Sequence, residues 1–145
     1  MSKRKNNKNA ERQEKYMGNN FDFFGFSTCA RKTIFNKVNE KYKPSSITRE
    51  VVYRMVEHCY TFKEREMQYI GFDIIEKFWK KNLTKKDLNY LESLFEKKAW
   101  WDCCFIIRKF IAKILKKLDE EDRNKIARRY CNSDNRWLKR ISVTF

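Results

Sequence analysis

Glycine and proline are scarce in this chain, and their scarcity constrains the fold more than any other feature of the sequence. The 145 residues contain three glycines and one proline, where average usage would give about ten and about seven. Sandwiches and barrels need many tight turns, which depend on these two residue types. The sequence therefore disfavours an all-β fold and favours an all-α one.

Apolar residues recur at intervals of three and four almost without interruption, which is the period of an α-helix. We expect helices near residues 28–42, 46–60, 61–79, 84–95 and 100–118, one from about residue 120, and a last one after residue 133. Helices of this length with short loops form either a closed bundle or a stack of helical pairs. Two helices in about forty residues fit a HEAT-like repeat, but the periodicity alone leaves both architectures open.

Four short polar segments predict where helices begin. Thr61 with Glu64 has the spacing of a capping box and should open the long helix 61–79, and Thr84 with Asp87 should cap the next one. The acidic run 119–122 suits the positive end of a helix, and Ser133 should cap the last one.

Two helices should each carry one apolar side. In the helix near 28–42 that side holds Ile34, Phe35, Val38 and Tyr42. In the helix 100–118 the residues on one side form a longer stripe, which we expect to lie in the core: Trp100, Cys104, Ile107, Ile111, Ile114 and Leu118.

Charge is the strongest compositional signal. Lysine and arginine outnumber aspartate and glutamate by 34 to 19, a net charge of +15, so we expect a polyanionic partner. Composition does not distinguish nucleic acid, an acidic protein and a membrane surface. Residues 1–10 are predicted as a disordered basic leader, for which a simple solvated tail is the alternative, and residues 11–145 as one domain.

Cysteine and histidine offer no support for a staple or a metal site. The five cysteines form no CxxC pair and there is a single histidine, so we expect neither a disulfide framework nor a zinc site, and no cofactor. The apolar run 103–107 is too short to cross a bilayer. We therefore expect an intracellular, non-membrane protein with reduced thiols, either cytoplasmic or nucleoid-associated.

Three separated segments carry a family resemblance. They are Tyr16–Arg31, Glu64–Gln68, and the motif Trp100-Trp101-Asp102 followed by Ser133–Arg140. In this order they resemble the AlkD-like DNA alkylation repair enzymes, which are HEAT-like repeat DNA glycosylases. The resemblance covers about residues 15–145. It implies a curved, right-handed superhelix of antiparallel helical pairs, with a basic concave face that holds double-stranded DNA. We expect the protein to be a monomer.

The resemblance also implies a catalytic site with one departure. In the family, a tryptophan of the Trp-Trp-Asp motif offers its ring to the sugar and the base, and an aspartate lies one helical turn further on the same face. Here the tryptophan is Trp101, but the aspartate position holds Phe105. The nearest carboxylate, Asp102, lies about 60° round the helix from Phe105. The catalytic candidates are thus Trp101 and Asp102, and we expect release of N3- or N7-alkylated purines to be weak or lost.

Three further residues are candidates for DNA binding. The resemblance places Tyr16 near the DNA backbone and Arg140 on a phosphate. Lys113 belongs to a basic run between residues 97 and 117 that is either a DNA track or a solvated outer face. The family's Thr-Pro helix cap reads Thr28-Cys29, so we expect Thr28 to supply the cap oxygen.

Several functions and one question of length stay open. The chain is a DNA-binding member that has lost the chemistry, an active glycosylase that uses Asp102, or a basic helical-repeat module for an acidic protein or RNA. The DNA partner could be damaged or branched. The family's second tryptophan lies beyond the position of Phe145, so the domain is either complete as it stands or shortened at its C-terminal end.

Overall fold

The computed structural model describes residues 7–43 and 46–143. Within these residues it contains eight α-helices and no strand. Its β-type pairing in the same residues is an isolated bridge between Asp22 and Glu64. The predicted all-α fold is confirmed.

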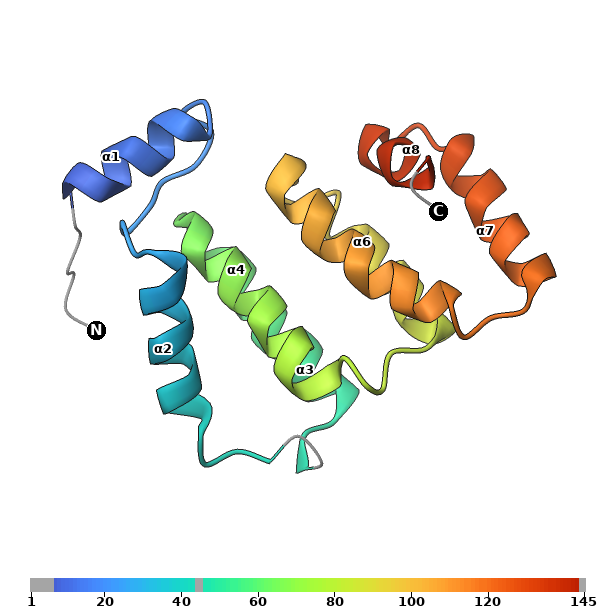
Figure 1. Ribbon diagram of the computed structural model, residues 1–145, viewed down its shortest axis with the longest axis horizontal. Coiled ribbons are helices and arrows are strands. Elements are labelled where there is room, and N and C mark those ends of the chain that lie inside the picture. The colour runs from blue at the N-terminus through green and yellow to red at the C-terminus, as the bar shows by residue number, and fades with distance from the viewer. Residues whose placement is uncertain (1–6, 44–45, 144–145) are drawn as a thin grey trace. The chain divides into compact units, whose positions relative to one another are not determined.

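The chain divides into two compact units, Met1–Trp79 and Lys80–Phe145, here called unit 1 and unit 2. Unit 1 contains α1 (Asn7–Tyr16), α2 (Thr28–Asn39), α3 (Arg49–Thr61), α4 (Arg65–Ile74) and the π-helical η2 (Ile75–Trp79). Unit 2 contains the 3₁₀-helical η3 (Lys85–Asp87), α5 (Leu88–Ser93), α6 (Trp101–Leu115), α7 (Glu120–Cys131) and α8 (Arg136–Ser142) (Figure 1).

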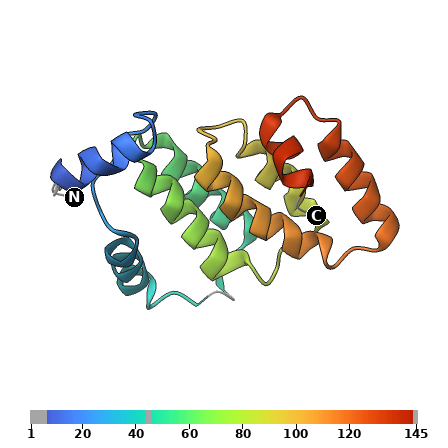
Figure 2. The ribbon, with the colours of Figure 1, turned by 45° about the horizontal axis from the view of Figure 1, so that its top comes forward.

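Helices α3 and α4 lie side by side and form the centre of unit 1 (Figures 1 and 2). Val52 and Val56 of α3 and Phe72 of α4 are buried. Gly71 allows the two helices to approach closely, because a Cβ atom at this position would lie 3.3 Å from Cγ1 of Val56. A larger residue at position 71 would therefore push the helices apart.

The segment 21–26 joins α1 to α2 and is held from both sides by side chains. The Glu66 carboxylate of α4 accepts hydrogen bonds from the backbone N–H groups of Phe24, Gly25 and Phe26, at 3.0, 2.8 and 3.1 Å. From α1, Asn9 Nδ2 donates to the Gly25 carbonyl at 2.6 Å. Gly25 has a φ of 91°, a backbone conformation that favours glycine.

Helix α2 turns polar side chains inward. Arg31 forms an ion pair with Asp73 of α4. The Asn39 side-chain amide donates to the Phe35 carbonyl at 2.8 Å, and the Asn39 backbone carbonyl accepts from Lys77 Nζ at 2.9 Å. The predicted apolar side is therefore wrong in part, because its member Phe35 is buried while its other three residues are exposed: Ile34, Val38 and Tyr42.

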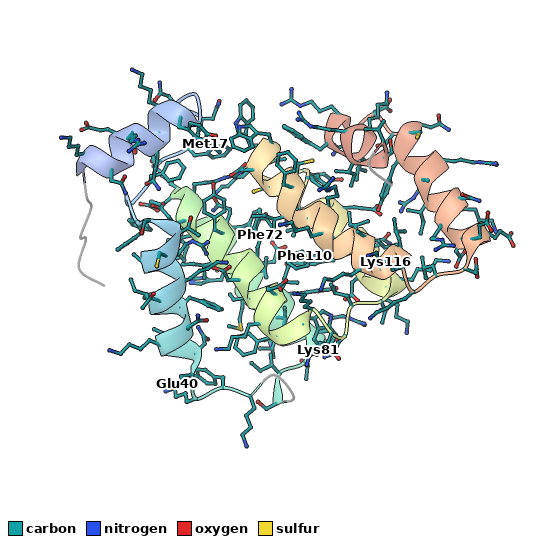
Figure 3. The ribbon with its side chains drawn as sticks, in the orientation of Figure 1. Met17, Glu40, Phe72, Lys81, Phe110 and Lys116 are labelled. Carbon is teal, nitrogen blue, oxygen red and sulfur yellow. The ribbon has the colours of Figure 1, made fainter. Side chains whose placement is uncertain are left out.

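Helix α6 supplies the core of unit 2. Cys104, Ile107, Ile111 and Ile114 of the predicted stripe are buried, as is Phe110 (labelled in Figure 3). The two ends of the stripe, Trp100 and Leu118, are half-buried instead. The predicted core side is thus confirmed in its middle.

The carboxylate of Glu92 in α5 ties α7 to the unit. It accepts from the Arg129 guanidinium at 2.6 and 2.9 Å and from the Tyr130 hydroxyl at 2.7 Å. Burial raises the pKa of Tyr130, and its hydrogen bond to Glu92 raises it further. The hydroxyl therefore stays a donor at neutral pH.

Two of the expected helix starts are confirmed. Thr84 and Asp87 form the predicted capping box, and Asp119 caps α7 by accepting from the Asp122 N–H at 2.8 Å. The start predicted at Thr61 is wrong, because its hydroxyl donates to the His58 carbonyl and closes α3. Helix α4 begins at Arg65, whose N–H donates to the Asp22 carbonyl at 2.8 Å.

Three other expectations need correction. Asn135, not Ser133, caps α8, and Ser27, not Thr28, caps α2 by accepting from the Ala30 N–H at 3.1 Å. Residues 7–10 of the expected leader belong to α1, where Ala10 is buried. Residues 1–6 lie outside the described residues.

Candidate functional site

The first turn of α6 presents two aromatic rings. Trp100 is the extended N-cap residue, so Trp101 begins the helix. The rings of Trp101 and Phe105 lie one turn apart, with centroids 6.3 Å from each other and planes at 76°. The Phe105 side chain is 46% exposed and Trp101 is half-buried. We call this pair the aromatic corner.

One arginine lies against the aromatic corner. The Arg108 guanidinium carbon is 5.8 Å from the centroid of the Phe105 ring. Burial raises the pKa of the Cys104 thiol, and the charges of Arg140 and Arg108 act against that shift. Arg140 from α8 is therefore near Cys104, whose buried side chain leaves α6 about 100° from that of Phe105.

Helix α8 is positioned by a contact between two tryptophans. The ring of Trp137 meets that of Trp100 edge-on, with 6.2 Å between centroids. The side-chain oxygen of Asn135 accepts a hydrogen bond from the backbone N–H of Trp137 at 2.9 Å and so fixes the start of α8. Arg140 lies one turn after the start of this short helix, which packs against α6, and it is exposed.

Asp102 lies in the first turn of α6 and is half-buried. A carboxylate at this place interacts favourably with the positive end of the helix dipole. This position gives Asp102 a structural role that does not depend on any substrate.

Of the other two candidates, Lys113 lies apart from this group on α6, and Tyr16 belongs to unit 1. Lys113 lies in the last turn of α6, more than three turns after Trp101 and so about 18 Å away along the helix. Tyr16 is the last residue of α1 in unit 1, where its side chain is 74% exposed. The structure thus brings together Trp101, Phe105 and Arg108, and places Arg140 near the buried Cys104 of the same helix.

Sequence reasoning missed part of this surface. Arg108 was visible only as one of many basic residues, although its position three residues after Phe105 puts the two on neighbouring parts of a helix. Arg136 was missed altogether: its guanidinium carbon lies 4.7 Å above the centroid of the Trp137 ring. An arginine directly before a tryptophan in the sequence was the available signal.

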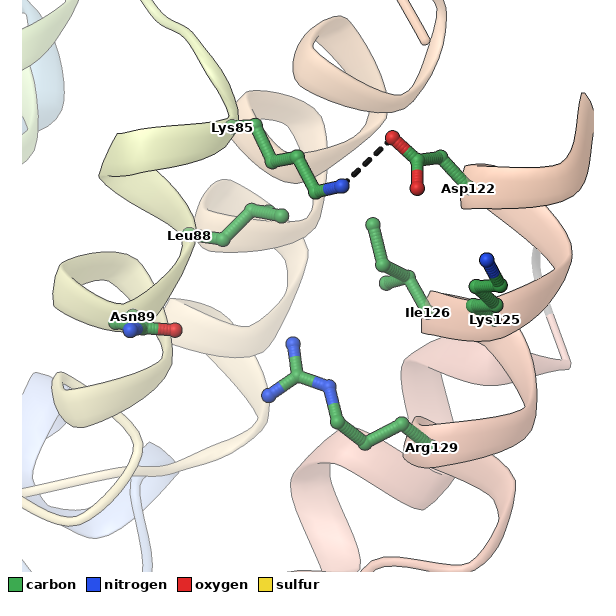
Figure 4. Close-up of a pocket in the computed structure, with 7 residues that line it drawn as sticks. All are labelled: Lys85, Leu88, Asn89, Asp122, Lys125, Ile126 and Arg129. Carbon is green, nitrogen blue, oxygen red and sulfur yellow. Dashed lines mark hydrogen bonds and ion pairs between the residues drawn. The ribbon is translucent and has the colours of Figure 1, made fainter. Parts of the chain in front are cut away.

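A pocket of about 380 Å³ opens between η3, α5 and α7 of unit 2 (Figure 4). It is lined by Lys85, Leu88, Asn89, Asp122, Lys125, Ile126 and Arg129. Leu88 and Ile126 point into it, and Lys85 pairs with Asp122 at 2.6 Å (Figure 4). Lys125 and Arg129 also have carboxylate partners, at 2.6 Å each. The pocket is therefore charge-balanced and offers an anion little attraction.

The part of the chain that the structure describes has neither a metal-binding cluster nor a membrane-spanning helix. There, no group of three or more His, Cys, Asp or Glu side chains could hold a metal ion. No helix among residues 7–43 and 46–143 is both long and apolar enough to cross a membrane.

Comparisons with known proteins give one family and one fold. A sequence model of the family "DNA alkylation repair enzyme" matches residues 1–145. A solved structure described as a predicted DNA alkylation repair enzyme from Enterococcus faecalis is similar at a TM-score of 0.84 and 21% identity. The similarity covers 99% of this chain and 65% of that one, so the chain spans 65% of the length of that protein. No curated protein matches the sequence.

Proposed function

The chain belongs to the DNA alkylation repair enzyme family, and on that premise we propose that it binds double-stranded DNA through α6 and α8 but releases alkylated purines weakly or not at all. One observation carries the proposal. Where the family resemblance implies a carboxylate, the chain has the exposed Phe105 ring with the Arg108 charge 5.8 Å from its centroid.

The expected loss of chemistry follows from electrostatics. Breaking the bond to an alkylated, positively charged base leaves positive charge on the sugar. Groups aimed at charge that develops in a transition state are usually the largest catalytic contribution, and losing one costs about 2.7–4 kcal/mol. A phenyl ring supplies no such group, and the Arg108 charge beside it is of the wrong sign.

Binding needs other features, and these are present. Arginine forks suit phosphate oxygens, which supports Arg140 and Arg108 as phosphate contacts. The exposed part of the aromatic corner can stack on a base or a sugar. The net charge of +15 favours any polyanion. Uniform binding of this kind gives affinity without rate.

The remaining parts of the proposal follow from this binding mode. The protein would act as a monomer on damaged or branched DNA, in the cytoplasm or at the nucleoid, without a cofactor. An active glycosylase that uses Asp102 is the second candidate, because this half-buried carboxylate directly follows Trp101 in the first turn of α6. A module for RNA or an acidic protein is the third.

A titration of labelled duplex tests the binding. Affinity should fall steeply between about 50 and about 200 mM salt and vary little with sequence, because phosphate contacts release counterions and read no bases. Arg140→Ala should weaken binding about tenfold, a typical loss for one charge-assisted contact, and Lys113→Ala should weaken it less. If only Lys113→Ala weakens binding, the surface lies elsewhere; if RNA binds and duplex does not, the third candidate is correct.

A base-release assay on duplex with N7-methylguanine tests the chemistry. Wild type should release the base at about the rate of free DNA, and Phe105→Asp should release it faster if position 105 faces the sugar. Rapid release by wild type that is lost in Asp102→Asn would instead establish the glycosylase candidate. Binding and release are measured separately, so either part can fail alone.

A further inference from the structure

Helix α2 carries an exposed apolar stripe, and we propose that this stripe docks an acidic, amphipathic helical segment of a partner protein. The stripe consists of Ile34, Val38 and Tyr42, whose side chains are 45%, 61% and 47% exposed. Ile34 and Val38 are four residues apart on one side of α2, and Tyr42 follows the turn at the end of the helix. Contiguous exposed apolar residues of this kind mark interaction sites more often than single ones do.

The stripe is exposed because polar contacts fix the rotation of α2. The buried residues of this helix are Arg31, Phe35 and Asn39. Arg31 pairs with Asp73 and its guanidinium carbon lies 5.4 Å from the centroid of the Tyr69 ring. Turning the helix to bury Ile34 and Val38 would break this pair and leave a charge without its partner. The fold therefore holds two aliphatic side chains in water while it buries an arginine.

Charges around the stripe indicate the chemistry of the partner. Lys37 and Lys41 flank it, and the Lys41 Nζ atom lies 5.3 Å from the centroid of the Tyr42 ring. Between residues 37 and 43 the chain has three lysines, all exposed, and Glu40 as its acidic residue. An apolar stripe with a cationic border matches a helix that has apolar anchors and acidic flanks.

Other occupants fit this surface less well. A second copy of the chain would bring the same lysines and a net charge of +15 against them. Duplex DNA would gain from the lysines but not from Ile34 and Val38, because phosphates and sugars offer aliphatic carbons little. A membrane-surface helix has a much larger apolar face than three side chains.

Ile34 and Val38 span about 6 Å along α2, the rise of four helical residues, and Tyr42 extends the stripe past the end of the helix. The stripe can therefore accept about two turns of a partner helix whose apolar residues recur at i, i+4 and i+7. An interface of this size is small, and we expect weak, transient binding. The proposal does not depend on the DNA-binding surface of unit 2.

The probe for a test is a synthetic helical peptide of about 15 residues, with leucines at i, i+4, i+7 and i+11 and mostly glutamates elsewhere. Its binding to the full chain is measured by fluorescence anisotropy. One control peptide has lysine for every glutamate, and another has serine for every leucine. We expect the acidic, leucine-bearing peptide to bind and both controls to bind at least about tenfold more weakly.

Variants of the chain locate the binding. The double variant Ile34→Ser with Val38→Ser should weaken binding about tenfold or more, since apolar anchors carry most of the energy of such contacts. Lys37→Glu should weaken it about threefold. Lys32→Glu is the matched control, because Lys32 is exposed but leaves α2 about 120° from Val38, and it should bind like wild type.

The double variant should keep the urea midpoint of wild type, because both side chains are exposed. Equal peptide binding by wild type and the double variant, or no binding by wild type, overturns the proposal. So does a lowered midpoint, which would show that the stripe is covered within the protein. A loss of duplex binding, of anionic phosphatidylserine vesicle binding or of a wild-type dimer in the double variant would assign the stripe to that occupant instead.

Discussion

The two units bury different kinds of residue. Among the described residues, the buried polar or charged side chains of unit 1 are Arg31, Asn39, Arg65, Glu66 and Gln68, whereas unit 2 has Asp87. Unit 2 keeps its ion pairs, such as those of Lys85 and Lys125, at the surface and buries the aliphatic side of α6. Unit 1 is therefore held in one arrangement by specific polar partners, and unit 2 mainly by apolar packing.

This difference predicts different responses to substitution. Removing one partner of a buried polar contact leaves the other buried with neither a protein partner nor water to bond to, which lowers the free energy of unfolding by several kcal/mol at most. Removing one partner of an exposed pair returns the other to solvent at little cost. The sensitive positions should thus be polar in unit 1 and aliphatic in unit 2.

The largest effect should come from Glu66→Ala. Three backbone N–H groups in the segment 21–26 lose their acceptor together, and we expect a loss of about 3–5 kcal/mol in the free energy of unfolding by urea. Glu121→Ala in unit 2 is the control. Its partner Lys125 is exposed, so the loss should be below about 0.5 kcal/mol. Similar losses in the two variants would remove the contrast between the units.

The next effect should come from Ile111→Ala at the centre of α6. Ile111 is fully buried, and truncation leaves a cavity that costs about 3 kcal/mol. Ile111→Val, which removes a single methyl group, should cost about 1 kcal/mol. Urea unfolding measures both. A loss well below 1 kcal/mol for alanine would mean that the core of unit 2 can collapse around the gap and is loosely packed.

Tyr130→Phe should have a smaller effect of about 1 kcal/mol, because it removes a single hydrogen bond to Glu92. The pKa of Tyr130 is raised by burial, so the hydroxyl stabilises the fold below the ordinary phenol pKa of about 10 and loses this contribution as the pH rises further. The difference in the free energy of unfolding between wild type and Tyr130→Phe should therefore shrink above about pH 10. A difference that grows above this pH would show that the folded protein stabilises the phenolate form of Tyr130.

The smallest effect should come from Lys85→Ala. The hydrogen bond from Lys85 holds the pKa of Asp122 below its usual value, so the variant should raise that pKa toward normal in an NMR titration. A lowered pKa means that the pair contributes above the ordinary aspartate pKa and is lost as the pH falls through the lower value. An unchanged Asp122 pKa in the variant would show that another cation controls it.

Features within one helical turn could be read from the sequence. Thr84 and Asp87 lie three residues apart, and both halves of their capping box depend only on local backbone. The meeting of Trp101 with Phe105 followed from the helical period in the same way. Features that depend on distant partners could not be read. Thr61 has the spacing of a helix start, but the Asp22 carbonyl fixes the start of α4 at Arg65.

The apolar pattern of α2 misled for a related reason. Periodicity ranks residues by hydropathy and assumes that arginine faces water. Asp73 and Tyr69 make the interior acceptable to Arg31, and both lie about forty residues away. The same limit applies to the candidate site. The aromatic corner of α6 was predictable, but the position of α8, which carries Arg140, depends on the contact between Trp100 and Trp137.

The hydrogen bonds between Glu66 and the segment 21–26 have a consequence for the order in which unit 1 folds during synthesis. The three hydrogen bonds span 40 to 42 residues of sequence. The chain emerges from the ribosome N-terminus first. Helix α1, this segment and α2 therefore emerge well before the Glu66 carboxylate that binds the segment. Contacts so distant in sequence form slowly. The three hydrogen bonds can therefore form only after α4 has emerged, and until then we expect α1, this segment and α2 to be accessible to proteases and chaperones.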